Sequence, residues 1–301
     1  MMSIATRFRL LGLLLLTPGL ALAQSACRFE QSQEVGLDLA GVRTLAIELG
    51  RHSLHLDAAS DGDGIVRIRA CASSQARLDA LSLVQQRDDT RLHLQARDDG
   101  GSNVFGLFGG SDYAYQQLAL RIPRNIAVTL SIGSGDAQVA AVAALDAEIG
   151  SGDLTARTIS GPVSVRIGSG DVVLTSVGGL SVPSLGSGDL LAKGIGGDLN
   201  IGEVGSGDLE ASDIAGSVRL DALSSGDVAL RAINGSVQIG SIGSGDLTIA
   251  RVGGSISVDR LGSGDIDVRD VRGDVRVASK GSGDVDTADV DGEVLIENDR
   301  R

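Results

Sequence analysis

The tetrapeptide Gly-Ser-Gly-Asp occurs nine times in the C-terminal part of the chain, once with Ser224 in place of the first glycine. The spacing between successive aspartates is 17, then 18 twice, and then 19 five times. A nearly constant period of this kind is typical of one structural unit that stacks on copies of itself. The nine aspartates are Asp136, Asp153, Asp171, Asp189, Asp208, Asp227, Asp246, Asp265 and Asp284.

The repeat from Asp246 to Asp265 shows the pattern within each unit. Apolar residues stand at offsets 1, 3, 6, 10, 12 and 15 from the first aspartate, and pairs two residues apart place side chains on one face of a strand. A single coil cannot bury its apolar face, so coils must stack. The sequence predicts an all-β fold in which residues 131–301 form a parallel β-solenoid of about eight or nine coils, roughly 40 Å long at about 4.8 Å per coil.

Residues 24–130 alternate apolar and polar residues in short runs such as 45–49 and 65–70, broken by turn residues. This alternation predicts further strands. The segment 61–64 (Asp-Gly-Asp-Gly) indicates a turn between two of them, and a short helix fits residues 76–83. We expect this β-rich region to cap one end of the solenoid.

The first 23 residues have the form of a secretory signal peptide. Arg7 and Arg9 precede an apolar run over residues 10–22, and Ala21-Leu22-Ala23 fits a cleavage site. No later apolar stretch has the length of roughly 20 residues that a membrane-spanning helix needs, so the mature chain is expected to lack a transmembrane segment. These features predict an exported protein, either periplasmic or extracellular and associated with the cell surface.

The chain has two cysteines, Cys27 and Cys71. An even number of cysteines in an oxidising compartment favours one disulfide between them. Two free thiols are the alternative.

The net charge is −13, and two thirds of the 39 acidic residues lie in residues 131–301. An acidic field of this kind repels nucleic acid and anionic membranes. Nucleic acid is therefore not an expected partner.

The recurring pattern within the nine tetrapeptides allows two interpretations of the aspartates. In the first, each aspartate accepts backbone hydrogen bonds in a tight turn, and the second glycine is required because the turn needs φ > 0 and no Cβ between coils. In the second, the stacked carboxylates bind calcium, which takes oxygen ligands. The opposite half-turns carry serine three times and aspartate only twice, which fits a calcium site poorly, so no cofactor is expected.

Residues 131–301 contain no His, Cys, Met, Phe, Tyr or Trp, whereas ligand pockets are usually lined by aromatic and convergent polar side chains. His52 and His55 have opposite parity on a strand, so we expect them, like His93, to be surface residues. The sequence does not predict an enzyme; a polysaccharide-acting β-helix is the least favoured alternative.

Four of the six aromatic residues fall within residues 105–115. This segment is either a long hairpin loop that folds back over the protein or a contact loop for a partner or lipid surface. The candidate contact residues are Phe105, Leu107, Phe108, Tyr113 and Tyr115.

The signal peptide, the strand-rich lead-in, residues 121–124 (Arg-Ile-Pro-Arg) and the Gly-Ser-Gly-Asp turns together resemble the bacterial adhesin-like family of β-strand-repeat proteins, a domain of unknown function. They also resemble the related head domain of autotransporter adhesins. The resemblance implies a right-handed β-solenoid and an adhesin-like or scaffold role in the cell envelope. The implied partner is a protein or a component of the envelope or matrix, and end-to-end self-association is compatible with the fold.

Overall fold

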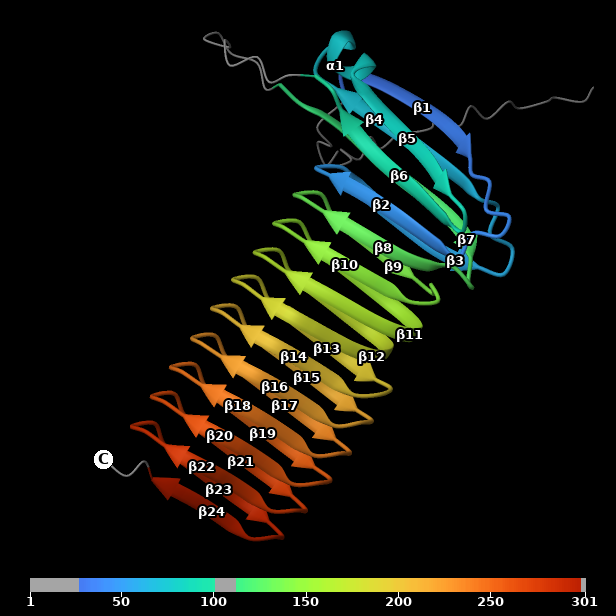
Figure 1. Cartoon of the computed structure of the whole chain (residues 1–301). Coiled ribbons are helices and arrows are strands. Elements are labelled where there is room, and N and C mark those ends of the chain that lie inside the picture. The colour runs from blue at the N-terminus through green and yellow to red at the C-terminus, as the bar shows by residue number, and fades with distance from the viewer. Residues whose placement is uncertain (1–26, 101–111, 299–301) are drawn as a thin grey trace, which may run out of the picture.

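The computed structural model describes residues 27–100 and 112–298, which form 24 strands and one short helix. The strands make two facing walls that run the length of the molecule (Figure 1). Strands from successive repeats pair in parallel within each wall, because each coil passes through both walls before it returns to the first. The predicted all-β parallel β-solenoid is confirmed.

One wall, here called the β1 wall, is built from strands that contain the first half of each repeat. The head is the end of the molecule that is built mainly from residues 27–123. Its neighbouring strands include antiparallel pairs, and all later pairs are parallel. The order is β1 (Phe29–Gly36), β4 (Ile65–Ala72), β7 (Ala114–Pro123), β3 (Ser53–Ala59), β9 (Ala137–Ala140), the first halves of β11 (Leu154–Ile167) and β12 (Val172–Leu185), β13 (Leu190–Ile195), β15 (Leu209–Ile214), β17 (Val228–Ile233), β19 (Leu247–Val252), β21 (Ile266–Val271) and β23 (Val285–Val290).

The opposite wall, here called the β5 wall, contains the second half of each repeat. Helix α1 (Gln75–Asp79) connects the two walls at the head, next to β4 and β5. The order is β5 (Leu81–Asp88), β6 (Arg91–Asp98), β2 (Thr44–Gly50), β8 (Ala127–Ile132), β10 (Leu145–Ile149), the second halves of β11 and β12, β14 (Leu199–Val204), β16 (Val218–Leu223), β18 (Val237–Ile242), β20 (Ile256–Leu261), β22 (Val275–Lys280) and β24 (Val294–Asn298).

The hydrophobic core is the narrow space between the walls. In the repeat that follows Asp246, the six predicted inward residues are all buried. The same inward positions are apolar in nearly every coil, so one continuous core links the head to the last coils. The inward residues of that repeat are Leu247, Ile249, Val252, Ile256, Val258 and Leu261.

The head continues both walls. The coil formed by β2 and β3 lies between the β6–β7 coil and the β8–β9 coil, although it comes first in the chain. The boundary expected between residues 130 and 131 falls inside β8, because the apolar space between the walls extends into the head. The segment 61–64 joins β3 to β4, but these strands are not hairpin partners, since each of them pairs with β7.

The second glycine of the tetrapeptide is required for space and not for its φ angle. Its φ is not positive in any of the nine copies. A Cβ built on Gly226 would lie 2.0 Å from the carbonyl oxygen of Gly207 in the preceding coil. A Cβ on the first glycine would meet a carbonyl oxygen at 2.4–2.8 Å, and this looser contact explains why Ser224 is accepted there. The predicted positive φ was wrong, while the predicted crowding is present.

The left-handed residues lie five positions after each aspartate. All nine of these residues have φ between +54° and +74°, and only one of them is glycine. They bend the chain at the corner where the β1 wall ends, so each coil carries one left-handed residue at a position with no preferred residue type. They are Ala141, Thr158, Ser176, Gly194, Asp213, Ala232, Arg251, Asp270 and Asp289.

Candidate functional site

A groove of about 780 Å³ lies on the outer surface at the head of the β1 wall. It crosses five strands, β1, β4, β7, β3 and β9. Small side chains form its floor, because Ala119 lies between Arg67 and His55 in the strand register, and Ser53 lies beside Gln117. This hollow is called the outer groove below.

Charged residues at the rim of the outer groove are paired with one another. Arg67 bonds Asp63 at 2.9 Å and Glu34 at 3.2 Å, and Arg69 bonds Glu30 at 2.7 Å. The hydrogen bond from Arg69 holds the pKa of Glu30 below its ordinary value. Beside these two arginines a ligand would therefore meet paired charges, hydrogen-bonding groups and small side chains. Asp136, whose Oδ1 accepts from the backbone N–H of Asp153, lines the groove at its β9 edge.

His55 also lines the outer groove. Its Nε2 lies 2.9 Å from Asp57 Oδ2 and its Nδ1 lies 3.2 Å from Gln138 Oε1. His55 and His93 have exposed faces, but His52 is only 2% exposed. The expectation that all three histidines are surface residues was wrong for His52, because it stands at the corner before β3, where its Nδ1 accepts a hydrogen bond from the backbone N–H of Gln116 at 3.0 Å.

An exposed apolar pair continues the outer face of the β1 wall beyond the groove. Val173 and Leu191 are register partners on β12 and β13, and they are 38% and 46% exposed. Gln138 and Thr155 connect them to the groove in the same row of outward residues. Neighbouring exposed apolar side chains of this kind often mark a contact surface.

The nine aspartates form a ladder along one corner of the solenoid. The Oδ1 atom of each of the first eight accepts a hydrogen bond from the backbone N–H of the next aspartate, at 2.8–3.2 Å. The carboxylates therefore bond the coil that follows, rather than their own turn. This arrangement also offsets the repulsion between neighbouring carboxylates.

A second ladder runs along the opposite corner. Asp198 accepts from the N–H of Ser217 at 2.8 Å, and Ser217 accepts from the N–H of Ser236 at 3.3 Å. The bonds continue through Ser255 to Asp274. Serine and aspartate are interchangeable here because each offers one acceptor oxygen to the next coil.

The calcium interpretation of the aspartates gains no support from the structure. Within residues 27–100 and 112–298, no three His, Cys, Asp or Glu side chains are grouped so that they could hold a metal ion. One oxygen of each bonded aspartate is already occupied by a backbone donor.

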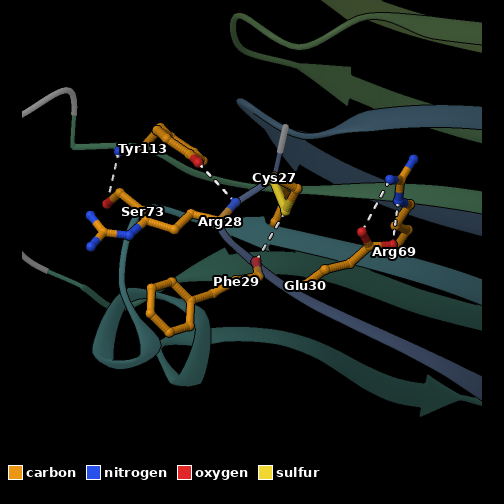
Figure 2. Close-up of a disulfide and its surroundings, with 8 residues drawn as sticks. Cys27, Arg28, Phe29, Glu30, Arg69, Ser73 and Tyr113 are labelled. Atoms are coloured by element: carbon orange, nitrogen blue, oxygen red, sulfur yellow. Dashed lines mark hydrogen bonds and ion pairs between the residues drawn. A yellow bond between two sulfur atoms is a disulfide. The ribbon is translucent and has the colours of Figure 1, made fainter. Parts of the chain in front are cut away.

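Cys27 and Cys71 form a disulfide, with their Cα atoms 5.7 Å apart (Figure 2). It joins the start of β1 to β4 on the head. Tyr113 lies beside it, where its hydroxyl accepts from the N–H of Arg28 at 3.2 Å. The rings of Tyr113 and Tyr115 are 6.4 Å apart, and both residues are half-buried. The other expected contact residues, Phe105, Leu107 and Phe108, lie outside the described residues.

A buried ion pair on the head was not predicted from the sequence. Both terminal nitrogens of Arg77, on helix α1, bond the carboxylate of Asp98 at 3.2 and 3.1 Å, and the two side chains are 11% and 4% exposed. The Nε atom of Arg77 lies 3.2 Å from Asp112. Arg77 therefore links the end of β6 to the residues before β7, and no local pattern of residues indicates that these positions meet.

Residues 179–300 match the family described as Toastrack DUF4097, whose function is unknown. The C-terminal part of the chain is therefore similar to this family. The match agrees with the resemblance to an adhesin-like family of β-strand repeats, which is confirmed. No curated protein matches the chain.

Several solved structures align with most of the chain at low sequence identity. A Bacteroides fragilis protein described as a "putative adhesin" is 14% identical, with a TM-score of 0.39, and the alignment covers 90% of this chain and 98% of that one. A Parabacteroides distasonis protein described as a "putative lipid binding protein" is 16% identical, with a TM-score of 0.43 and coverage of 89% and 96%. A "putative adhesin" of Parabacteroides merdae is 12% identical, with a TM-score of 0.41 and coverage of 89% and 96%.

Proposed function

We propose that this chain is an exported, non-enzymatic β-solenoid that acts as an adhesin-like or scaffold protein of the bacterial cell envelope. The observation that carries the proposal is the outer groove, a hollow of about 780 Å³ on the β1 wall. Its small floor residues leave room for a partner's side chains, and its paired rim charges offer hydrogen bonds.

The exposed pair of Val173 and Leu191 extends this contact face along the wall. A partner that lies across both features would bury apolar surface at one end and meet hydrogen-bonding groups at the other. Interfaces of this mixed character are common among proteins that bind other macromolecules. The partner that fits is a protein or a component of the envelope or matrix.

Export is supported by the disulfide between Cys27 and Cys71, since disulfides persist in oxidising compartments. No helix in the described part of the chain is long and apolar enough to span a bilayer. Cell fractionation with an antibody against the protein tests the location. Recovery in the cytoplasm would contradict export, and recovery with the periplasm or the medium would support it.

The binding face is tested with two matched variants. Ala119→Trp fills the outer groove, and Ser164→Trp places the same side chain on the outer face of the β5 wall. We expect the purified protein and the Ser164 variant to bind isolated envelope or matrix material, and the Ala119 variant to lose binding. Equal binding by both variants would contradict the proposed face, and release of sugars from a polysaccharide would contradict the non-enzymatic role.

A further inference from the structure

A second hollow lies between the two walls at the head, and its lining is polar. This head cavity has a volume of about 260 Å³. It is lined by Gln31 and Gln33 of β1, Gln116 of β7 and Asp79 of α1, with Ala70 and two leucines. Elsewhere the space between the walls is filled by apolar side chains, so this concentration of amides is a local exception.

The strand register creates the cavity. Gln31, Ala70 and Gln116 are direct partners across β1, β4 and β7. The small Ala70 leaves a gap between two amides whose strands are about 10 Å apart, two strand spacings. Leu78 and Leu81 close the other side, and the exposed Gln31 and Gln33 leave a mouth to solvent.

Gln116 is the residue that needs an explanation. It stands at an inward position of β7 between Ala114 and Leu118 and is 1% exposed. Its side-chain Oε1 accepts no hydrogen bond from the described part of the chain. A buried amide oxygen without a partner is costly, whereas an apolar side chain carries no such cost. The amide is therefore placed where a molecule that brings its own hydrogen bonds would satisfy it.

We propose that the head cavity binds a small neutral molecule with several hydroxyl groups, such as a single sugar ring. Primary amides both donate and accept, as hydroxyl groups do, and Asp79 adds an acceptor. Asp79 is the one charged group among the described lining residues, so anions are disfavoured. At about 30 Å³ per water, the cavity holds roughly nine waters, which is the scale of one ring and not of a chain.

The site lies on the opposite face of β7 from the outer groove, because Gln116 and Gln117 point to opposite faces of that strand, and the two hollows share only Gln33 of the edge strand β1 among the described lining residues. This separation gives a matched control. Gln116→Leu removes the buried amide, and Gln117→Leu makes the same change on the outer face. Gln31→Ala removes the amide at the mouth, where an exposed side chain contributes little to folding.

The experiment is saturation-transfer difference NMR of the purified full chain with glucose, galactose and N-acetylglucosamine, with acetate as the anionic counterpart. We expect signals from at least one sugar and none from acetate. Gln116→Leu and Gln31→Ala should weaken binding at least tenfold, and Gln117→Leu should not. Gln116→Leu should also raise Tm by a few degrees, because it removes an unpaired buried amide oxygen. Absence of sugar signals, acetate binding, or undiminished binding by the Gln116 variant would overturn the proposal, while the envelope-binding test of Ala119→Trp would be unaffected.

Discussion

The close contact between glycines of neighbouring coils predicts that two alanine substitutions, similar in sequence, lower the thermal stability by very different amounts. Gly226→Ala would place a Cβ 2.0 Å from the carbonyl oxygen of Gly207. Gly243→Ala, in the first position of the next tetrapeptide, would place one 2.7 Å from the carbonyl oxygen of Ser224. Both changes reduce the freedom of the unfolded chain equally, so the difference between them reports the contact between coils.

The magnitude follows from the distance that the coils must move. A tolerable contact of about 3.2 Å requires a separation of roughly 1.2 Å at position 226 and only about 0.5 Å at position 243. The larger movement breaks the hydrogen bonds from the N–H groups of Ser225 and Gly226 to Gly205, at 2.9 and 3.0 Å, and from Asp227 to Asp208, at 3.0 Å. At about 1 kcal/mol each, the loss is roughly 3 kcal/mol. The smaller movement stretches such bonds without breaking them and should cost under about 1 kcal/mol.

Thermal unfolding followed by circular dichroism measures the difference. We expect Gly226→Ala to lower Tm by about 6–12 °C and Gly243→Ala by less than about 4 °C. Both proteins should keep the far-ultraviolet spectrum of the parent below the transition. If the two variants melt together, the glycine is not required for space and the reasoning fails.

Three further predictions concern the ladder, the corner and the buried histidine. Asp227→Asn keeps the acceptor for the next coil and removes a repulsion of about 0.8 kcal/mol per neighbouring carboxylate in water, so its urea midpoint should match or exceed that of the parent. Asp227→Ala removes the acceptor and should lose about 1 kcal/mol of stability; if the alanine variant were the more stable of the two, the ladder would not stabilise the fold. Thr158→Gly should raise Tm and Gly194→Ala should lower it, because the left-handed backbone conformation costs a residue other than glycine about 1–2 kcal/mol. A lower Tm for Thr158→Gly would show that the corner is unstrained. Burial lowers the pKa of His52, so the unfolded chain takes up a proton at a higher pH than the folded chain does. The contribution of His52 to stability should be complete above about pH 6.5 and decline as pH falls below it. Urea titrations at two pH values should show that His52→Gln reduces this decline.

The sequence predicts the coil well because each inward position requires an apolar side chain. The apolar offsets read from Asp246 to Asp265 match the buried residues of that coil, since only side chains without polar atoms fit between the walls. The left-handed corner could not be located this way. Arg251 and Thr158 share a backbone conformation and no chemistry, so a search for glycine leads to the wrong residue.

The head was harder to predict because its neighbours are distant in sequence. The β2–β3 coil is placed between strands that follow it in the chain, and no local pattern records such an insertion. Gln116 and Gln31 look like ordinary surface residues in an alternating strand. Only the register across Ala70 places them on either side of one cavity, with Gln116 buried and Gln31 at its mouth.

The way coils pair also makes length an adjustable property of this protein. From β13 to β22, each strand bonds only the strand one coil before it and the strand one coil after it. A whole repeat unit can therefore be gained or lost with both neighbours meeting the same surface they met before. Each such event moves the far end of the molecule by about 4.8 Å and leaves the head untouched. Duplication of a repeat would thus change the length of the solenoid, and with it the distance from the head to the far end, in steps of one coil.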